Sequence, residues 1–197
     1  MRENDKFLKK IKFFTLVILI IVSNNLFARD TISMLLDYNK NLKNNKVSFI
    51  QTDGETVEEG DIYIGFDRVK IEYKKPNKIS IILSSNKGMY VNHELKEVQY
   101  FNTNKSFIKV FFKTLIGDDF YKDSNLDIFN DSIVVKNNFF ANDIFYKTEI
   151  IYENNPIKLR KIKILESNNL LELGFYNFNT REDISKKIFS LINPYLN

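Results

Sequence analysis

The feature that most constrains the fold is an alternation of charged and apolar residues. Residues 68–74 read Arg-Val-Lys-Ile-Glu-Tyr-Lys, so every second side chain is charged and those between are apolar. The same period of two runs through residues 47–51 and 61–66. Side chains of a β-strand point in turn to opposite faces of the sheet, so such strands have one solvent-exposed face and one buried face. The chain is therefore predicted to be mainly β-sheet, with one face buried.

Turn residues divide the chain into short strands of similar spacing. Asp53-Gly54, Pro76-Asn77 and Asn154-Asn155-Pro156 are typical of tight turns. Strands that recur about every 10–14 residues, with no helix between them, indicate an antiparallel meander. A composition that is 44% hydrophobic, with 18 Phe and 10 Tyr, excludes a disordered chain. Further strand-like runs lie at 78–84, 88–92, 96–101, 126–136, 144–152, 157–166 and 169–178.

Two segments depart from this period. Residues 31–44 space their apolar side chains, and Asn39 with them, as a helix does, and Asp30 or Thr31 is available as the N-cap. Residues 105–116 read Lys-Ser-Phe-Ile-Lys-Val-Phe-Phe-Lys-Thr-Leu-Ile, which as a helix is apolar over more than half its circumference. A helix this apolar must be covered on both sides. It either packs in the core or lies over an apolar cavity, with one side on the protein and the other on a ligand.

The first 28 residues are typical of an export signal. Residues 1–12 are basic, residues 13–22 are a predominantly apolar run, and the segment ends in Leu-Phe-Ala. The alternative is a membrane anchor, but this run is shorter than the about 20 apolar residues that cross a bilayer. We expect cleavage after Ala28, which leaves residues 29–197 as a single exported domain without a linker.

Charge gives no indication of a nucleic-acid partner. The signal segment contains five of the chain's 29 basic and two of its 25 acidic residues, which leaves 24 basic and 23 acidic residues in the rest. The basic character of the whole chain therefore reports mainly the signal segment. We expect no nucleic-acid binding.

Cysteine and histidine, which many catalytic and metal sites require, are scarce in this chain. The chain has no cysteine and one histidine, His93, in a sequence typical of a turn, where a solvated side chain is the ordinary outcome. The sequence has no nucleophile-elbow, phosphate-loop or zinc-protease motif. The pairs Glu58-Glu59 and Asp118-Asp119 would point to opposite faces of a strand. We expect no enzymatic activity, no metal site and no cofactor.

An ordered set of short motifs resembles a known family. Residues 47–51 contain a Phe-x-Gln opening strand, residues 60–64 a strand led by glycine, and residues 69–76 a strand that ends in Tyr, two residues and Pro. A strand and hairpin at 81–90 and a strand start at 95–98 follow, and the apolar segment 106–116 comes next. In this order the motifs resemble the outer-membrane lipoprotein carrier protein (LolA) family over about residues 31–195.

The resemblance implies both a fold and a function. The fold is an open, incomplete antiparallel β-barrel of about eleven strands, with helices covering the mouth of a cavity. The function is that of a monomeric periplasmic chaperone that accepts acylated lipoproteins from an inner-membrane ATP-driven exporter. It shields their acyl chains in the apolar cavity and delivers them to an outer-membrane receptor or to the outer membrane directly. The alternatives are a periplasmic lipid- or lipoprotein-binding sensor module of the same architecture and a purely structural β-protein with a filled barrel.

Strand parity, combined with the resemblance, predicts the residues of the site. Where the family has an Arg-Pro pair whose Arg latches the lid, this chain has Phe66 at the latch position, and Arg68 lies on the opposite parity. The lid segment is expected at 106–116, with Phe107, Val110, Phe111 and Leu115 facing the acyl chains. The expected cavity residues are Phe49, Ile62, Ile64, Phe66, Val69, Ile71, Tyr73, Ile81 and Leu83.

Overall fold

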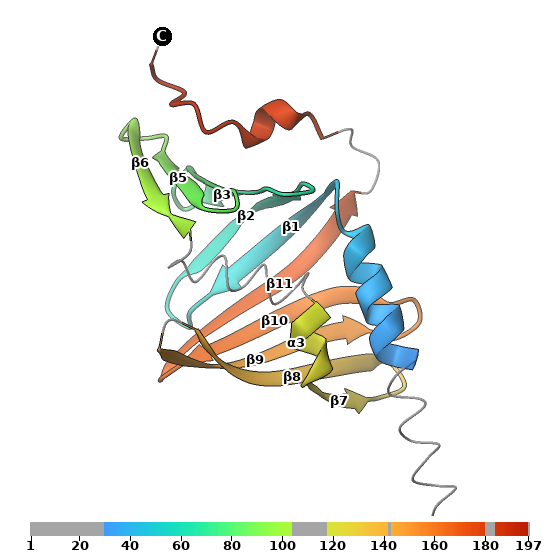
Figure 1. Ribbon diagram of the computed structural model, residues 1–197. Coiled ribbons are helices and arrows are strands. Elements are labelled where there is room, and N and C mark those ends of the chain that lie inside the picture. The colour runs from blue at the N-terminus through green and yellow to red at the C-terminus, as the bar shows by residue number, and fades with distance from the viewer. Residues whose placement is uncertain (1–29, 104–117, 142, 180–183, 197) are drawn as a thin grey trace, which may run out of the picture. The chain divides into compact units, whose positions relative to one another are not determined.

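A single antiparallel sheet of eleven strands dominates the computed structural model, which describes residues 30–103, 118–141, 143–179 and 184–196 (Figure 1). The strands lie in the lateral order β6-β5-β4-β3-β2-β1-β11-β10-β9-β8-β7. They are β1 (Asn45–Thr52), β2 (Val57–Ile64), β3 (Val69–Lys75), β4 (Ile79–Leu83), β5 (Lys87–Asn92), β6 (Glu97–Asn102), β7 (Asn125–Ile128), β8 (Ser132–Ala141), β9 (Ile144–Glu153), β10 (Lys158–Glu166) and β11 (Asn169–Asn179).

The strand order confirms the predicted open architecture. Strands β1 to β6 form one meander and β7 to β11 a second, and the antiparallel pairing of β1 with β11 joins the two. Strands β6 and β7 are the two edges of the described sheet, which is not closed into a barrel. The alternation and the turn residues predicted the antiparallel strands, and the resemblance to the family implied the open barrel of about eleven strands.

Three helical segments accompany the sheet in the described residues. Residues 30–41 form the predicted helix, which ends three residues early because residues 42–44 form a turn. The other two are the short helix α3 (Asp118–Lys122) and the 3-10 helix η2 (Lys186–Phe189). No helix in the described ranges has the length and apolar composition that would span a bilayer. The chain divides into two compact units, residues 1–37 and 38–197, and the contacts below lie within the second.

One strand prediction is wrong. The run 126–136 is two strands, β7 and β8, because the chain turns back at Asn130-Asp131. The Phe129 N–H donates to the carbonyl oxygen of Ser132 over 2.8 Å and closes the turn. Apolar residues continue on both sides of this turn, so the period of two conceals it.

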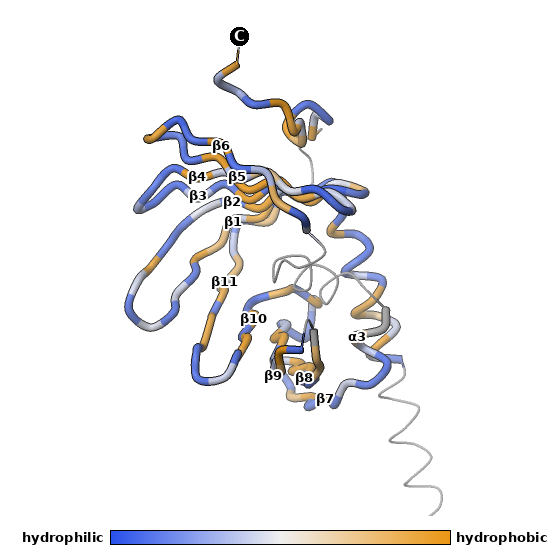
Figure 2. Tube along the Cα trace, turned by 60° about the vertical axis from the view of Figure 1, so that its left-hand side comes forward, coloured by the Kyte–Doolittle hydropathy of each residue, from blue (hydrophilic) through white to orange (hydrophobic). Residues whose placement is uncertain are grey.

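Pairing register assigns each side chain to a face, because paired residues of antiparallel strands lie on the same face. An apolar row crosses the first meander and continues across the second; we call the face that carries it the inner face. Figure 2 shows apolar and polar residues interspersed along the strands, as expected for a two-faced sheet. The row runs Tyr90, Ile81, Ile71, Ile62 and Val47, then from the Phe49–Phe175 pair to Leu173, Ile162, Ile150, Val135 and Leu126.

A glycine makes the centre of this face possible. Gly60 is paired with Phe49 on one side and Tyr73 on the other. The two rings meet edge to face, with their centroids 5.3 Å apart. A Cβ atom on Gly60 would lie 2.7 Å from the Phe49 ring and would collide with the carbonyl oxygen of Glu72. Only a residue without a side chain fits here.

The C-terminal segment, residues 184–196, contacts the opposite, outer face. Ile82, Met89 and Val91 are buried there, and Leu191 and Tyr195 pack against them. This cluster gives the outer face of β4 and β5 a small core of its own.

Candidate functional site: the inner face of the sheet

Eight of the nine predicted cavity residues come together on the inner face, because they are paired with one another across β1 to β4. Six of these side chains are buried, and Tyr73 and Ile81 are half-buried. Burial raises the pKa of Tyr73 to about 12, and the negative charge of Glu58 adds to this effect. Its hydroxyl donates to Oε1 of Gln51 over 3.1 Å. The eight residues are Phe49, Ile62, Ile64, Val69, Ile71, Tyr73, Ile81 and Leu83.

Phe66 lies elsewhere. It belongs to the turn at residues 65–68 between β2 and β3, and 73% of its surface is exposed. The strand parity that predicted its position ends at Ile64, where the ladder stops. Its side chain lines a cleft of about 720 Å³ between this turn and residues 184–189.

Arg68 bonds to the C-terminal segment. Its Nη1 donates to the carbonyl oxygen of Phe189 over 3.1 Å, and its own carbonyl oxygen accepts from the Gly65 N–H over 2.8 Å. The guanidinium therefore ties the β2–β3 turn to residues 184–189.

The predicted lid residues Phe107, Val110, Phe111 and Leu115 lie outside the described residues. The chain on the N-terminal side of this segment is fixed at Thr103, which is buried. The Thr103 hydroxyl lies 3.3 Å from the carbonyl oxygen of Ser84 and 3.2 Å from that of Ser85, and it donates between them.

On the C-terminal side of the same segment, a closed triangle of buried polar groups fixes α3. Asn39 Nδ2 donates to the Tyr121 hydroxyl over 2.6 Å, and the Tyr152 hydroxyl donates to Asn39 Oδ1 over 3.1 Å. The two hydroxyl oxygens lie 2.6 Å apart. Burial raises the pKa of Tyr121 to about 12 and also raises that of Tyr152, so both phenols stay protonated and remain hydrogen-bond donors.

α3 lies against the inner face. Asn137, an inner-face residue of β8, donates from Nδ2 to the carbonyl oxygen of Phe120 over 2.7 Å. The Phe120 ring meets that of Phe139 edge to face at 6.2 Å. The helix and the triangle were missed in the sequence, although Asn39, a polar residue in an apolar helical stripe, was a signal for a buried polar contact.

The second meander also contributes side chains to the inner face. The predicted cavity set contains none of them, although the same alternation runs through 157–166 and 169–178. Among them Thr148 is buried, and its hydroxyl has no hydrogen-bond partner in the described structure. The buried hydrophobic members are Ile133, Val135, Tyr146, Ile150, Tyr152, Leu159, Ile162, Ile164, Leu173 and Phe175.

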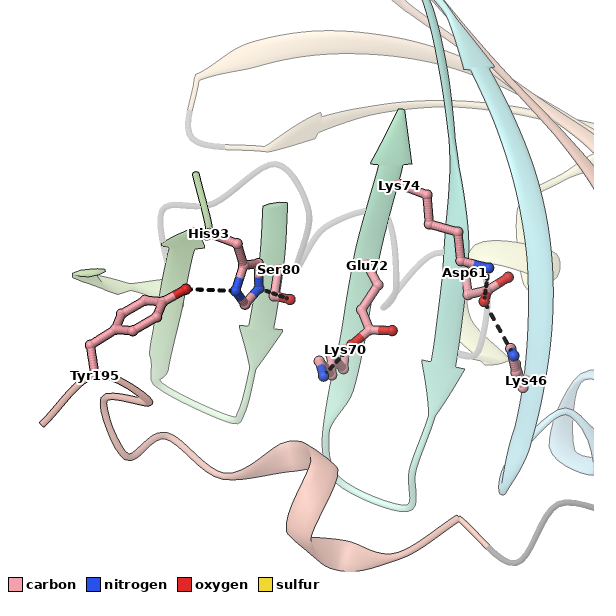
Figure 3. A network of polar contacts seen from close by, with 8 residues as sticks. All are labelled: Lys46, Asp61, Lys70, Glu72, Lys74, Ser80, His93 and Tyr195. Atoms are coloured by element: carbon pink, nitrogen blue, oxygen red, sulfur yellow. Dashed lines mark hydrogen bonds and ion pairs between the residues drawn. The ribbon is translucent and has the colours of Figure 1, made fainter. Parts of the chain in front are cut away.

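The outer face carries charges instead. The Asp61 carboxylate is buried between Lys74 and Lys46, whose Nζ atoms lie 2.6 and 3.2 Å from Oδ2 (Figure 3). Ser48 donates to Oδ1 over 2.8 Å. Burial alone would raise the pKa of Asp61, but the contacts with Lys74, Ser48 and Lys46 outweigh it, and the pKa is lowered.

The single histidine joins the C-terminal segment to the sheet. His93 lies in the turn after β5, as predicted, and its exposed ring is hydrogen-bonded on both sides. Nε2 lies 2.8 Å from Oγ of Ser80, and Nδ1 lies 2.8 Å from the Tyr195 hydroxyl (Figure 3). A phenol, not a carboxylate, thus orients the ring, and the contact holds residue 195 against β4 and β5.

An unclosed antiparallel sheet with an apolar inner face has the architecture of the open-barrel class of binding proteins. The model of the family "outer membrane lipoprotein carrier protein LolA" matches residues 40–192, and the chain belongs to this family. The members of the family are carrier proteins and not enzymes, in agreement with the expectation from the sequence.

Individual relatives are distant. RP864 of Rickettsia prowazekii (strain Madrid E), described as uncharacterized, is 24% identical over 197 residues, which are 95% of this chain and 89% of the relative. An uncharacterized conserved protein from Thermus thermophilus superimposes with a TM-score of 0.51 at 10% identity, over 82% of this chain and 91% of that one. MucB superimposes with a TM-score of 0.50 at 11% identity, over 84% of this chain and 62% of its own. These two structures support the fold.

Proposed function

We propose that the protein is a periplasmic carrier that accepts acylated lipoproteins released from the inner membrane and delivers them to the outer membrane. The observation that carries this proposal is the apolar row that crosses an unclosed sheet from β5 to β7. Residues 1–28 act as the cleaved export signal, and residues 29–197 form the single carrier domain.

The apolar inner face suits acyl chains because it offers a large area without directional contacts. Burial of one CH₂ group is worth about 0.8 kcal/mol, so a fourteen-carbon chain represents on the order of 10 kcal/mol. A face of branched and aromatic side chains supplies comparable area with no fixed register. The site is formed by the inner-face residues of both meanders, including the eight predicted ones.

Release requires that part of the buried area be removable. We assign this task to residues 106–116, with Phe107, Val110, Phe111 and Leu115 as the contacts to the acyl chains. Thr103 and Tyr121 support this assignment because both are fixed by hydrogen bonds and bracket the segment. A lid that opens between two fixed ends changes the affinity for lipid without unfolding the sheet.

The energy for loading then comes from outside the chain. An inner-membrane ATP-driven exporter would supply the lipoprotein, and an outer-membrane receptor or the outer membrane itself would accept it. The carrier acts as a monomer and uses no cofactor.

The direct test is native mass spectrometry of the protein recovered from the periplasm of expressing cells. The proposal expects complexes whose added mass is that of acylated protein. A chain that carries no lipid, and binds no fluorescent fatty acid after purification, would support the purely structural β-protein instead.

A pair of matched variants tests the face. Ile81→Asp places a charge on the inner face and should weaken fatty-acid binding at least about 10-fold. Ile50→Asp makes the same change at an exposed position of the outer face and should leave binding unchanged. Circular dichroism shows whether each variant keeps its sheet.

A sensor module of the same architecture would bind lipid but not pass it on. Incubation of the loaded protein with outer-membrane fractions distinguishes the two, because a carrier loses its lipoprotein to the membrane and a sensor keeps it.

A further inference from the structure

The free end of the β8–β9 hairpin is apolar on both faces. Its last two pairs are Phe140 with Phe145 and Ala141 with Ile144. Phe140 is 74% exposed, Phe145 is 40% exposed and Ile144 is 37% exposed. The rings of Phe140 and Phe145 lie 5.1 Å apart on the outer face. The rings of Phe139 and Tyr146 stack at 5.7 Å on the inner face. We call Phe139, Phe140, Ile144, Phe145 and Tyr146 the hairpin tip.

The pairing registers leave the outermost residues of the hairpin tip without a strand neighbour. The pairing of β10 with β9 stops at Tyr146, so Phe145 and Ile144 have no partner on β10. On the other side, β7 pairs with residues 133–136 of β8 only. Strand alternation in a water-exposed hairpin normally leaves one face polar. Here the exposed apolar side chains lie on both faces, Phe140 and Phe145 on the outer face and Ile144 on the inner face, beyond the last pairs with β7 and β10. Tyr146 is buried at the last of these pairs, opposite Glu166 of β10.

The adjacent hairpin adds to the same surface. The pairs Leu165 with Leu170 and Leu165 with Lys147 place these three side chains beside one another on the outer face. Leu170 is exposed near the end of the β10–β11 hairpin. Lys147 is exposed two residues behind Phe145 on the same face.

We propose that the hairpin tip docks into the interface of a phospholipid bilayer. A protein partner would cover one face of such a tip, whereas a bilayer interface surrounds an inserted end on both faces. Insertion into the interface would remove the exposed apolar area of Phe140, Phe145 and Ile144 from water. Residues 139–146 contain a single charge, Asp143, and Lys147 follows at the depth where headgroup phosphates lie.

The tip is continuous with the inner face. Tyr146 stacks on Phe139, Phe139 meets Phe120, and both strands lead on to Ile150 and Val135. A bilayer at the tip is therefore connected by apolar side chains to the proposed lipid site. This part of the inference rests on the proposed carrier function: acyl chains would pass between membrane and carrier without crossing water.

A tryptophan probe tests the docking, because the chain contains no tryptophan of its own. Phe140→Trp is compared with Phe129→Trp, which labels an exposed aromatic position at the opposite end of β8. The full chain is mixed with vesicles of phosphatidylethanolamine and phosphatidylglycerol whose acyl chains are brominated. We expect a blue shift and quenching of the Phe140→Trp emission and no change for Phe129→Trp. Each probe reports its own position, so membrane contact by residues 1–28 does not produce this pattern.

A second pair of variants measures the contribution to affinity. The double substitution Phe140→Ser and Phe145→Ser should lower the fraction of protein that floats with vesicles by about 10-fold or more, and Phe129→Ser should not lower it. Equal quenching at both tryptophan positions, or none at Phe140→Trp, would overturn the docking surface. A tip that binds a protein partner instead of a bilayer would give no quenching at Phe140→Trp.

Binding of a fluorescent fatty acid without vesicles separates this inference from the proposed function. The double serine variant should bind the fatty acid like the unaltered chain. Vesicle docking without fatty-acid binding would leave the docking surface standing and overturn the carrier. Fatty-acid binding with no vesicle response at Phe140→Trp would overturn the docking surface and leave the carrier function standing.

Discussion

The hydroxyl oxygens of Tyr121 and Tyr152 lie 2.6 Å apart, and Asn39 bonds to both. This contact joins α3, the first element after residues 104–117, to the inner face of β9. Sequence separations of 82 and 113 residues divide Asn39 from its two partners, so the triangle forms only once the sheet is assembled.

Tyr121→Phe should destabilise the protein by about 1–2 kcal/mol, because it leaves buried groups of Asn39 and Tyr152 without one of their partners. Urea unfolding followed by circular dichroism measures the change. Tyr176→Phe, at an exposed position of the outer face, is the matched control and should change stability by less than about 0.5 kcal/mol. Equal effects of the two substitutions would contradict the importance of the triangle.

Asp61→Asn should lower stability by about 2 kcal/mol at neutral pH, because it removes the carboxylate that Lys46 and Lys74 pair with. The pKa of Asp61 is lowered in the folded protein, so its stabilising contribution is present above the ordinary carboxyl pKa of about 3.9. That contribution is lost as the pH falls through the lower folded value. The difference between the unaltered chain and the variant should therefore shrink in acid. Urea titrations at neutral and acid pH test this, and a difference that stays constant would refute it.

Gly60→Ala should be severely destabilising, by about 3 kcal/mol, since the added methyl group meets the backbone of β3 and the Phe49 ring. The thermal midpoint measures the loss. Gly174→Ala is the control: the atom nearest to its added Cβ would be the carbonyl oxygen of Ile50 at 3.9 Å, an ordinary contact. A Gly60→Ala protein as stable as Gly174→Ala would show that the close approach of Phe49 and Tyr73 is unimportant.

Thr148→Val should stabilise the protein by about 1 kcal/mol, because the buried hydroxyl has no hydrogen-bond partner in the described structure and the side chains are similar in volume. Urea unfolding again gives the value. A marked loss of stability would mean that the hydroxyl is hydrogen-bonded in solution.

Tyr195→Phe should loosen the C-terminal segment by removing the hydroxyl that bonds to His93. The loss of one hydrogen bond predicts amide exchange about 3- to 10-fold faster in residues 184–196. Hydrogen exchange with mass spectrometry resolves these residues from β9 and β10, whose exchange should stay the same. Uniform acceleration across the chain would point to global destabilisation instead.

Period-two alternation predicted the strands and the inner-face residues of the first meander because the side-chain direction of a strand is fixed by its own sequence. The predicted position of Phe66 on the cavity face differs from the structure, because alternation fixes side-chain direction only within a strand, and the β2–β3 ladder ends at Ile64. The turn at Asn130-Asp131 was not predicted, because apolar residues flank it on both sides. The hydrogen bond from Arg68 to Phe189 could not be predicted from local sequence patterns, since it joins residues 121 positions apart.

The edges of the sheet have a mechanical consequence. Within the described sheet β6 and β7 are not hydrogen-bonded to each other, so no seam fixes the circumference. In a sealed barrel, strand number and stagger set the diameter, and cargo must match it. Here a small change in twist, summed over many strands, widens or narrows the girth while every existing ladder stays intact. If the protein carries lipid as proposed, elastic deformation of the unclosed sheet would let it accommodate lipids of different bulk.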